Sequence, residues 1–312
     1  MRRTCLDMVY ELAKRDPRVV FIGSDLGPGV LDQMKTEMPD RFFMEGIQEQ
    51  HLIGMAAGMA MEGYIPYVNT IATFLTRRCF EQLAVDLCLH NLPVRLIANG
   101  GGLVYAPLGP THLAIEDMGI LRTLPNMTVV APTDAEEMKR FMPETLEPPG
   151  PVYIRLAKGG DPIVSRDEDG FQIGKSIKLR AGKDVAMIAT GVMVNRALAA
   201  AEVLAGEGID CAVVNMHTIK PLDEERILNL AGTTPVLITL EEHVLAGGMG
   251  SAVSELLTDK FDGRPPVLKR IGIPDAFPHE YGSQDSLMET LGLQPPEIAA
   301  AVRRIAARPS AA

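Results

Sequence analysis

A carboxylic acid at the start of a helix of small residues is the first side chain equipped for chemistry. Glu49 lies in MEGIQEQHLIGMAAGMA, where an apolar stretch gives way to a helical pattern. A carboxyl group at a helix start is usually a solvated cap, because the free N–H groups there favour negative charge. Burial instead favours the protonated form of a carboxyl group. A buried Glu49 could then hydrogen-bond a heteroaromatic ring nitrogen, and both interpretations remain open.

A phenylalanine and two adjacent arginines follow in NTIATFLTRRCFEQ, which changes from a loop into a helical pattern. Phe74 offers a ring face to a ligand, and Arg77 and Arg78 offer charges. The alternative is that Phe74 belongs to the core and the arginines form a solvated helix face.

The run GGGLVYAPLGPTH, from Gly100 to His112, joins three glycines to a histidine after a Gly-Pro turn. Consecutive glycines let a backbone approach a ligand or take positive φ angles. His112 lies near a predicted strand end, where α/β folds bind ligands. Cations near strand ends, here Arg155 and Lys158, could bind a phosphate group. A surface loop with solubilising charges is the alternative.

The elements that must position these residues alternate between strands and helices. Most of the predicted strands are continuous apolar runs, typical of a parallel sheet buried on both faces. With helical patterns between them, they predict an α/β fold. The strands are expected to begin near residues 19, 64, 93, 127, 151, 184, 210, 235 and 267.

The length of 312 residues suggests two domains. We expect a first α/β domain over 1–160, a linker without helical period over 161–183, and a second α/β domain over 184–312. The stretches Pro132–Glu137 and Pro221–Glu225 are each expected to start a helix with a capping residue followed by acids in the first turn. Glycines 54 and 58 each cost the predicted helix over 49–62 about 1 kcal/mol. Another backbone should therefore approach that helix, from a partner subunit or from the same domain.

The composition excludes several classes of protein. Hydrophobic residues make up 46% of the chain and charged residues 22%, which argues against disorder. The net charge of −10 argues against nucleic-acid and membrane partners. No apolar run approaches the roughly 20 residues that span a bilayer, and we see no signal peptide. The four cysteines lack CxxC spacing, so we expect neither zinc nor disulfides, and a cytoplasmic location.

Seven stretches occur in a fixed order: FIGSDLG, PDRFFMEGIQEQHLIGMAAGMAMEGYIPYVNT, ATFLTRR, GPTHLAIEDMGILRTLPNMTVVAPTDAEE, PVYIRLAKGG, TIKPLD and EEHVLAGGMGSAV. Together they resemble the C-terminal half of transketolase, and deoxyxylulose-phosphate synthase is similar over the same stretch. The resemblance covers about residues 3–305. It implies a pyrimidine-binding α/β domain of a thiamine diphosphate enzyme, followed by the transketolase C-terminal domain.

The resemblance implies a transferase of carbohydrate metabolism that moves a two-carbon ketol unit from a ketose, phosphorylated in the family, to an aldose. In the family, a glutamate at the position of Glu49 hydrogen-bonds the pyrimidine nitrogen N1′ of the cofactor. Phe74 matches the ring that stacks on the aminopyrimidine. Ile71 stands where transketolases often have another aromatic residue, so this side of the cofactor pocket is expected to be aliphatic. Arg77 is expected beside the cofactor.

Substrate contacts also follow from the resemblance. His112 matches a histidine near the hydroxyl groups of the donor and is expected to be catalytic together with Glu49. Arg3 and Lys158 match positions that bind the sugar phosphate, and Arg155 is expected to assist them. A lysine in place of the family's arginine keeps the charge but loses the two-pronged hydrogen bonding.

Two departures concern the substrate. Pro107 and Leu108 replace an acidic pair that usually precedes the Gly-Pro-Thr-His turn, and Gly100 replaces a histidine. The donor is therefore hypothesised to differ from the usual sugar phosphates, for example in being less hydroxylated or not phosphorylated.

The family's N-terminal half has no counterpart in this sequence. In that half, a GDG motif and a later asparagine bind Mg²⁺ and the diphosphate, and this chain lacks such a motif. We therefore expect no metal ligands in this chain. A partner subunit, the transketolase N-terminal section, is expected to supply them in a heterotetramer.

Two alternatives remain open. The beta subunit of a 2-oxo acid dehydrogenase decarboxylase component has similar length and domain order, but its double-His loop is missing here. A non-catalytic scaffold subunit would keep the fold without turnover. The loss of the acidic pair favours a scaffold, whereas Glu49 and Phe74 count against it.

Overall fold

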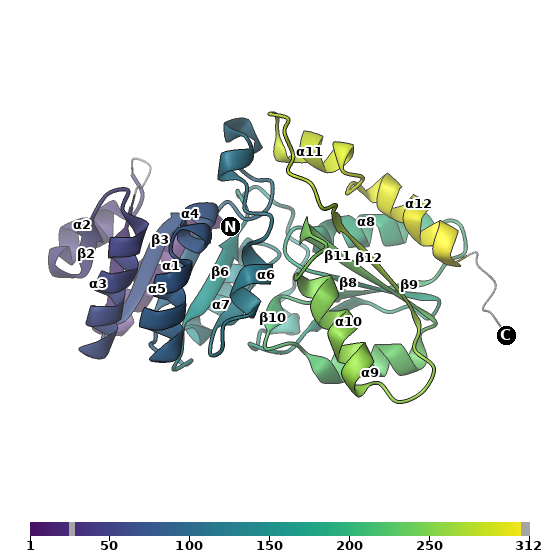
Figure 1. Ribbon diagram of the computed structural model, residues 1–312, viewed down its shortest axis with the longest axis horizontal. Coiled ribbons are helices and arrows are strands. Elements are labelled where there is room, and N and C mark those ends of the chain that lie inside the picture. Colours follow the sequence, from purple (N-terminus) through teal and green to yellow (C-terminus); the bar gives the residue numbers. More distant parts are fainter. Residues whose placement is uncertain (25–28, 307–312) are drawn as a thin grey trace.

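The computed structural model describes residues 1–24 and 29–306; residues 25–28, part of the FIGSDLG motif, and 307–312 lie outside the described part. The chain forms two α/β units in sequence, each built on its own sheet (Figure 1). The expected fold class of two consecutive α/β domains is therefore confirmed.

The first sheet has the strand order β10-β5-β6-β4-β3-β1-β2, and only the β10·β5 pair is antiparallel. Strands β1, β4 and β6 are buried along their whole length, as expected for continuous apolar strands between two helical layers. The short strand β2 was not predicted. The strands are β1 (Val19–Gly23), β2 (Phe42–Met44), β3 (Ile65–Ile71), β4 (Arg95–Asn99), β5 (Thr128–Val130), β6 (Val152–Leu156) and β10 (Thr218–Lys220).

Helices cover both faces of this sheet. Buried side chains of α1 and α7 pack on one face, and those of α3, α4 and the π-helix η2 pack on the other. The helices are α1 (Arg2–Arg15), α2 (Asp32–Glu37), η1 (Pro39–Arg41), α3 (Glu49–Met61), α4 (Ala72–Arg77), α5 (Phe80–Gln82), η2 (Leu83–Leu89), η3 (Ala106–Leu108), η4 (Pro110–His112), α6 (Asp117–Arg122) and α7 (Ala135–Glu144).

The second sheet has the order β12-β11-β8-β9-β7. Its edge strand β7 (Ile177–Arg180) pairs antiparallel with β9 and lies inside the segment 161–183 that we expected to be a linker. Part of that segment therefore belongs to the second domain. Its other strands are β8 (Val185–Ala189), β9 (Cys211–Asn215), β11 (Val236–Val244) and β12 (Val267–Ile273), and its helices are η5 (Asp167–Asp169), α8 (Met193–Ala205), α9 (Glu224–Thr233), α10 (Met249–Lys260), α11 (Gln284–Thr290) and α12 (Pro295–Ala306).

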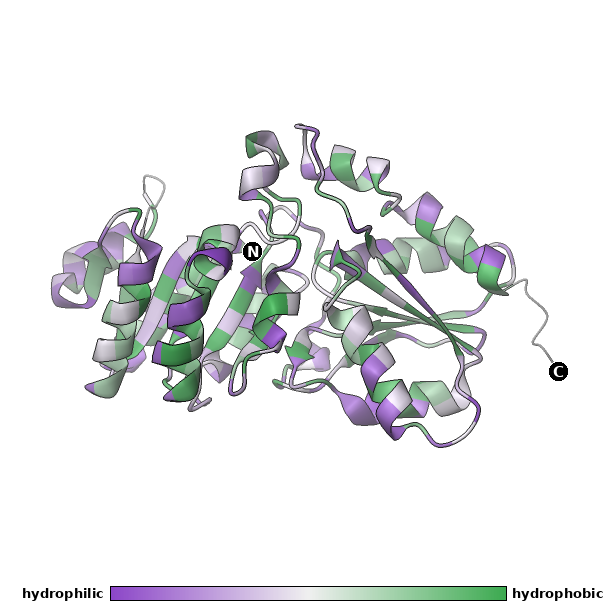
Figure 2. Ribbon diagram, in the orientation of Figure 1, coloured by the Kyte–Doolittle hydropathy of each residue, from purple (hydrophilic) through white to green (hydrophobic). Residues whose placement is uncertain are grey.

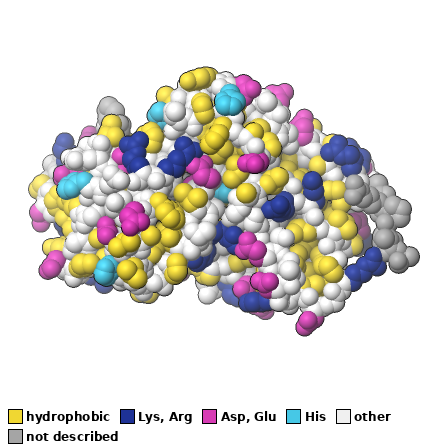
Figure 3. Space-filling view, viewed as in Figure 1, with side chains coloured by type: hydrophobic (Ala, Val, Ile, Leu, Met, Phe, Trp, Pro, Cys, Tyr) yellow, Lys and Arg dark blue, Asp and Glu magenta, His cyan; other side chains and the backbone are white. Residues whose placement is uncertain are grey.

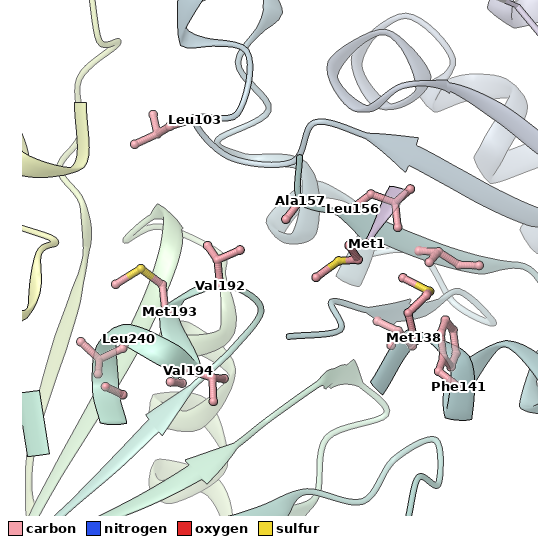
Figure 4. Close-up of a cluster of buried hydrophobic side chains, with 14 of the residues drawn as sticks. Met1, Leu103, Met138, Phe141, Leu156, Ala157, Val192, Met193, Val194 and Leu240 are labelled. Carbon is pink, nitrogen blue, oxygen red and sulfur yellow. The ribbon is translucent and has the colours of Figure 1, made fainter. Parts of the chain in front are cut away.

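The two domains are joined by a strand that crosses between them and by a common hydrophobic cluster. Strand β10 follows β9 of the second domain but pairs with β5 at the edge of the first sheet. One hydrophobic cluster runs through both domains, and Figure 4 shows Met1 and Ala157 of the first domain facing Val192 and Met193 of the second. Hydrophobic residues line the strands of both sheets (Figure 2). The domains are therefore joined by a common core.

A buried carboxyl group also bridges the domains. Glu137 of α7 accepts hydrogen bonds from the backbone N–H of Thr133 at 2.6 Å and from the side-chain amide of Asn215, in β9, at 2.6 Å. Burial raises the pKa of Glu137 from 4.5 to about 8, although these hydrogen bonds act in the opposite direction.

The raised pKa predicts a pH dependence of stability. Between the unfolded value of 4.5 and the folded value of about 8, the folded chain binds more protons at Glu137 than the unfolded chain. Glu137 therefore adds on the order of a few kcal/mol to the free energy of unfolding. This stabilisation is fully present below the unfolded pKa and is lost as the pH rises to about 8. Burial also raises the pKa values of Glu241 and Glu242, so both proteins should lose stability as the pH rises, but the wild type should lose more than Glu137→Gln. Urea unfolding across this range measures the difference, and parallel pH profiles would contradict it.

Candidate active site

Glu49 is the first residue of α3 and is buried, with 2% of its side chain exposed. The hydroxyl of Ser24, just after β1, donates to Thr70 Oγ1 at 2.8 Å. Thr70 in turn donates to Glu49 Oε1 at 3.5 Å. The other oxygen, Oε2, accepts from an Arg78 guanidinium nitrogen at 3.0 Å. Glu49 is therefore a buried, hydrogen-bonded carboxylate at the carboxyl ends of the strands and not a solvated cap.

Phe74 and His112 lie in the same group of residues. The guanidinium carbon of Arg78 lies 4.2 Å from the centroid of the Phe74 ring. The His112 ring contacts the same phenylalanine edge-on, with 5.1 Å between ring centroids and 65° between planes. Arg78 thus connects Glu49 to Phe74, and Phe74 connects the pair to His112.

Glu49 and Phe74 border a pocket of about 150 Å³, whereas His112 and Arg78 contact Phe74 from outside its lining. At roughly 30 Å³ per water, this volume equals about five water molecules, which is room for one flat heteroaromatic ring. Of the predicted site residues, Glu49, Ile71 and Phe74 line the pocket. The sequence analysis missed the other lining residues, which are Arg2, Ser24, Ile47, Thr70, Asn99 and Tyr105. Ser24 and Asn99 stand at the carboxyl ends of β1 and β4, a position that signals ligand binding in α/β sheets.

Asn99 presents an unpaired hydrogen-bonding atom in this pocket. Its amide nitrogen donates to Asn69 Oδ1 at 2.9 Å, and 7% of Asn99 is exposed. Asn99 Oδ1 has no hydrogen-bond partner among the described residues. A buried acceptor without a partner is costly, so a ligand N–H group fits this place.

The three glycines at 100–102 make room for side chains of this chain itself. A Cβ atom at Gly100 would lie 2.1 Å from the Tyr105 ring, and one at Gly101 would lie 2.5 Å from Arg155 Cγ. A Cβ atom at Gly102 would lie 2.3 Å from Glu242 Cδ. Tyr105 therefore occupies the space of any side chain at position 100.

The structure does not support the expectation that Arg155 helps to bind the sugar phosphate. Only 6% of its side chain is exposed, and it donates to Asp117 Oδ2 at 2.8 Å and to the backbone oxygens of Ala114 and Glu242. Burial alone would lower the pKa of Arg155, but Asp117 and Glu242 together with Tyr153 outweigh it and hold the pKa above its ordinary value. The guanidinium is thus committed to an ion pair at the domain junction and does not offer a phosphate site.

The other predicted cations lie outside the pocket lining. Arg77 pairs with Glu116 and donates to the backbone oxygen of Leu113, so its neighbour Arg78 is the arginine that reaches Glu49. Arg3 is exposed and lies 3.8 Å from Asp7, and Lys158 is exposed. Arg77 ends α4 and Arg78 is its C-cap residue, so a shift of one residue decides which arginine pairs with Glu49.

The comparison with known proteins identifies both domains. Residues 1–160 match the transketolase pyrimidine-binding domain, and residues 174–298 match the transketolase C-terminal domain. The chain is 37% identical, over 309 residues, to a 6-deoxy-6-sulfo-D-fructose transketolase subunit of Clostridium sp. (strain MSTE9). That match covers 99% of this chain and 95% of the clostridial subunit. The chain belongs to the transketolase family.

This chain spans about half the length of some other relatives and nearly the whole length of another. A 1-deoxy-D-xylulose-5-phosphate synthase of Geobacter sulfurreducens is 42% identical over 95% of this chain, which spans 47% of the synthase. A split-gene transketolase solved as an inactive beta4 tetramer has a TM-score of 0.87 and 36% identity, over 97% of this chain and 96% of that one. A transketolase variant from Pichia stipitis, at 20% identity, shares the fold with a TM-score of 0.81 over 98% of this chain and 45% of its own length.

Across residues 1–24 and 29–306, no group of three or more His, Cys, Asp or Glu side chains could hold a metal ion. Of the helices in the described ranges, none is both long and apolar enough to cross a bilayer. The four cysteines, Cys5, Cys79, Cys88 and Cys211, are buried and free.

Proposed function

We propose that this chain is one subunit of a split transketolase. It transfers a two-carbon ketol unit from a ketose to an aldose with thiamine diphosphate, together with a partner subunit that carries the diphosphate-binding domain and Mg²⁺. The observation that carries this proposal is the buried carboxylate of Glu49 beside the Phe74 ring in a pocket the size of one ring.

The residues of the pocket fit an aminopyrimidine ring. Glu49 would hydrogen-bond a ring nitrogen, Phe74 and Ile71 would contact the ring, and the unpaired Asn99 oxygen would accept from an N–H group. Bound thiamine diphosphate would supply an electron sink for cleavage of the ketose. This chain would orient the ring, exclude water and hold a proton at the Glu49 carboxyl group.

His112 would contact the donor's hydroxyl groups, since it lies beside Phe74 at the edge of the site. Arg3 and Lys158 are exposed cations free of the core, which suits an anionic end of the sugar. A clostridial relative is named for a sulfonated sugar, and we extend the class of donor here to ketoses with an anionic terminal group. Pro107 and Leu108, which replace the acidic pair, also leave fewer acceptors for sugar hydroxyls.

Two observations support a partner subunit. Apart from adjacent residues and the backbone of α3 itself, no described atom lies within 4 Å of a Cβ placed at Gly54 or Gly58, so packing within this domain does not explain these helix glycines. Large hydrophobic side chains are also exposed in the first domain, among them Ile47 at 73% and Leu89 at 72%. Figure 3 shows hydrophobic side chains gathered on this part of the surface. A second chain over α3 would cover them, and a relative solved as a beta4 tetramer supports self-association.

Reconstitution tests the proposal. The chain should show little ketol transfer alone and gain activity when mixed with a partner chain that carries the GDG motif, to be sought in the neighbouring reading frame, together with thiamine diphosphate and Mg²⁺. Xylulose 5-phosphate and 6-deoxy-6-sulfo-D-fructose serve as donors. Full turnover by the chain alone would contradict the need for a partner, and a strong preference for xylulose 5-phosphate would remove the hypothesis of an unusual donor.

The same assay separates the alternatives. Release of CO₂ from a 2-oxo acid would favour a decarboxylase beta subunit, and the named relatives, which are a transketolase subunit and deoxyxylulose-phosphate synthases, do not favour it. A scaffold subunit would support the partner's activity regardless of its own Glu49.

A further inference from the structure

Arg78 contacts two residues that line the ring-sized pocket, Phe74 and Glu49, from a position beside the pocket rather than within its lining. Its guanidinium carbon lies 4.2 Å from the Phe74 ring centroid, and its terminal nitrogen donates to Glu49 Oε2 at 3.0 Å. A guanidinium is planar, stacks on aromatic faces and presents N–H donors along its edge. In shape and hydrogen bonding it stands in for a flat nitrogen ring over Phe74 and against Glu49.

The surroundings allow Arg78 to leave this position. Its side chain is 46% exposed, whereas that of Glu49 is 2% exposed. The backbone oxygen of Arg78 is fixed separately, because it accepts from the Gln50 side-chain amide at 2.8 Å. The guanidinium can therefore swing toward solvent while the end of α4 stays in place.

We propose that Arg78 is a displaceable competitor of the cofactor ring: its guanidinium covers one face of Phe74 and pairs with one oxygen of Glu49 in the free chain, and it must leave before the ring can use that face and that oxygen. This inference rests on the proposed function. One face of Phe74 and one carboxylate oxygen serve either the guanidinium or the ring, so the two compete. In the free chain the ion pair prevents Glu49 from remaining a buried charge without a partner.

If Arg78 and the cofactor ring compete, replacing Arg78 should lower the stability of the free chain and raise the affinity for thiamine diphosphate. Arg78→Met should melt at a lower temperature than the wild-type free chain, because Glu49 loses its cation. It should also bind thiamine diphosphate about tenfold more tightly in the reconstituted complex, because no guanidinium has to be displaced. If Arg78 only supported the fold, its replacement would lower both the stability of the chain and its affinity for thiamine diphosphate.

Isothermal titration of thiamine diphosphate with Mg²⁺ into the reconstituted complex measures the affinity. Arg303→Met is the matched control, because Arg303 is also 46% exposed and paired with a glutamate, Glu207, but lies on α12. Arg78→Lys keeps a cation without the planar group and should tighten binding by a smaller factor. It also serves if the methionine variant does not fold.

Each outcome bears on one claim. Unchanged or weaker cofactor binding by the Arg78 variants, relative to wild type and Arg303→Met, would overturn the displacement. In that case a loss of affinity in Glu49→Gln would still uphold the proposed function. If neither the wild-type complex nor any variant bound thiamine diphosphate, the proposed function itself would fail and this inference with it.

Discussion

Glu49→Gln should reduce ketol transfer by the reconstituted complex about a hundredfold or more. Glutamine has nearly the same shape as glutamate, but its amide cannot give up and retake a proton. Positioned proton transfer by a side chain contributes roughly 10²–10⁴ to enzymatic rates. The buried position of Glu49 and its hydrogen bond from Thr70 make compensation by water ineffective. Steady-state kcat with saturating thiamine diphosphate measures the effect.

Glu62→Gln is the control for this loss, because Glu62 is exposed just beyond the other end of α3. It should keep wild-type turnover, and circular dichroism should show that both variants remain folded. Wild-type turnover by the Glu49→Gln complex would show that the carboxyl group only supports the fold, and would favour the scaffold alternative.

The second large effect concerns stability. Arg155→Met should lower the free energy of unfolding by about 3–5 kcal/mol, because it leaves the fully buried Asp117 without its cation. Tyr153 still donates to Asp117 at 2.7 Å, but one hydroxyl does not balance a buried charge. Urea unfolding followed by circular dichroism measures the difference.

A double variant makes this prediction specific. Asp117→Asn combined with Arg155→Met removes both charges, so it should cost less than the sum of the two single changes. Arg303→Met breaks an exposed pair and should cost at most about 1 kcal/mol. An Arg155→Met protein as stable as the Arg303→Met control would refute a structural role for the buried pair.

The strands were predictable because most of them are continuous apolar runs. All nine expected strands are present in the structure. The caps were predictable too: Asp134 accepts from the backbone N–H groups of Glu136 and Glu137, and Asp223 accepts from that of Arg226. Local composition determines these features, since a short aspartate side chain satisfies the free N–H groups of the first turn.

What the sequence did not reveal depends on residues distant in the chain. Strands β2, β7 and β10 have three or four residues each, too few for a periodic signal. The glycines at 100–102 suggested a ligand loop, but they accommodate Tyr105, Arg155 and Glu242. Arg155 looked available for phosphate because its partner Asp117 lies 38 positions away. Spacing does not show such pairings.

The pairing of β10 with β5 has a consequence for protein synthesis. During translation, residues 1–160 leave the ribosome before β10, so β5 has an open edge at that stage. Open strand edges invite pairing with other chains and hence aggregation. A fragment that ends before residue 218 would keep this edge permanently uncovered. Truncated expression of the first domain should therefore yield insoluble material, and a soluble version needs the strand supplied in another way.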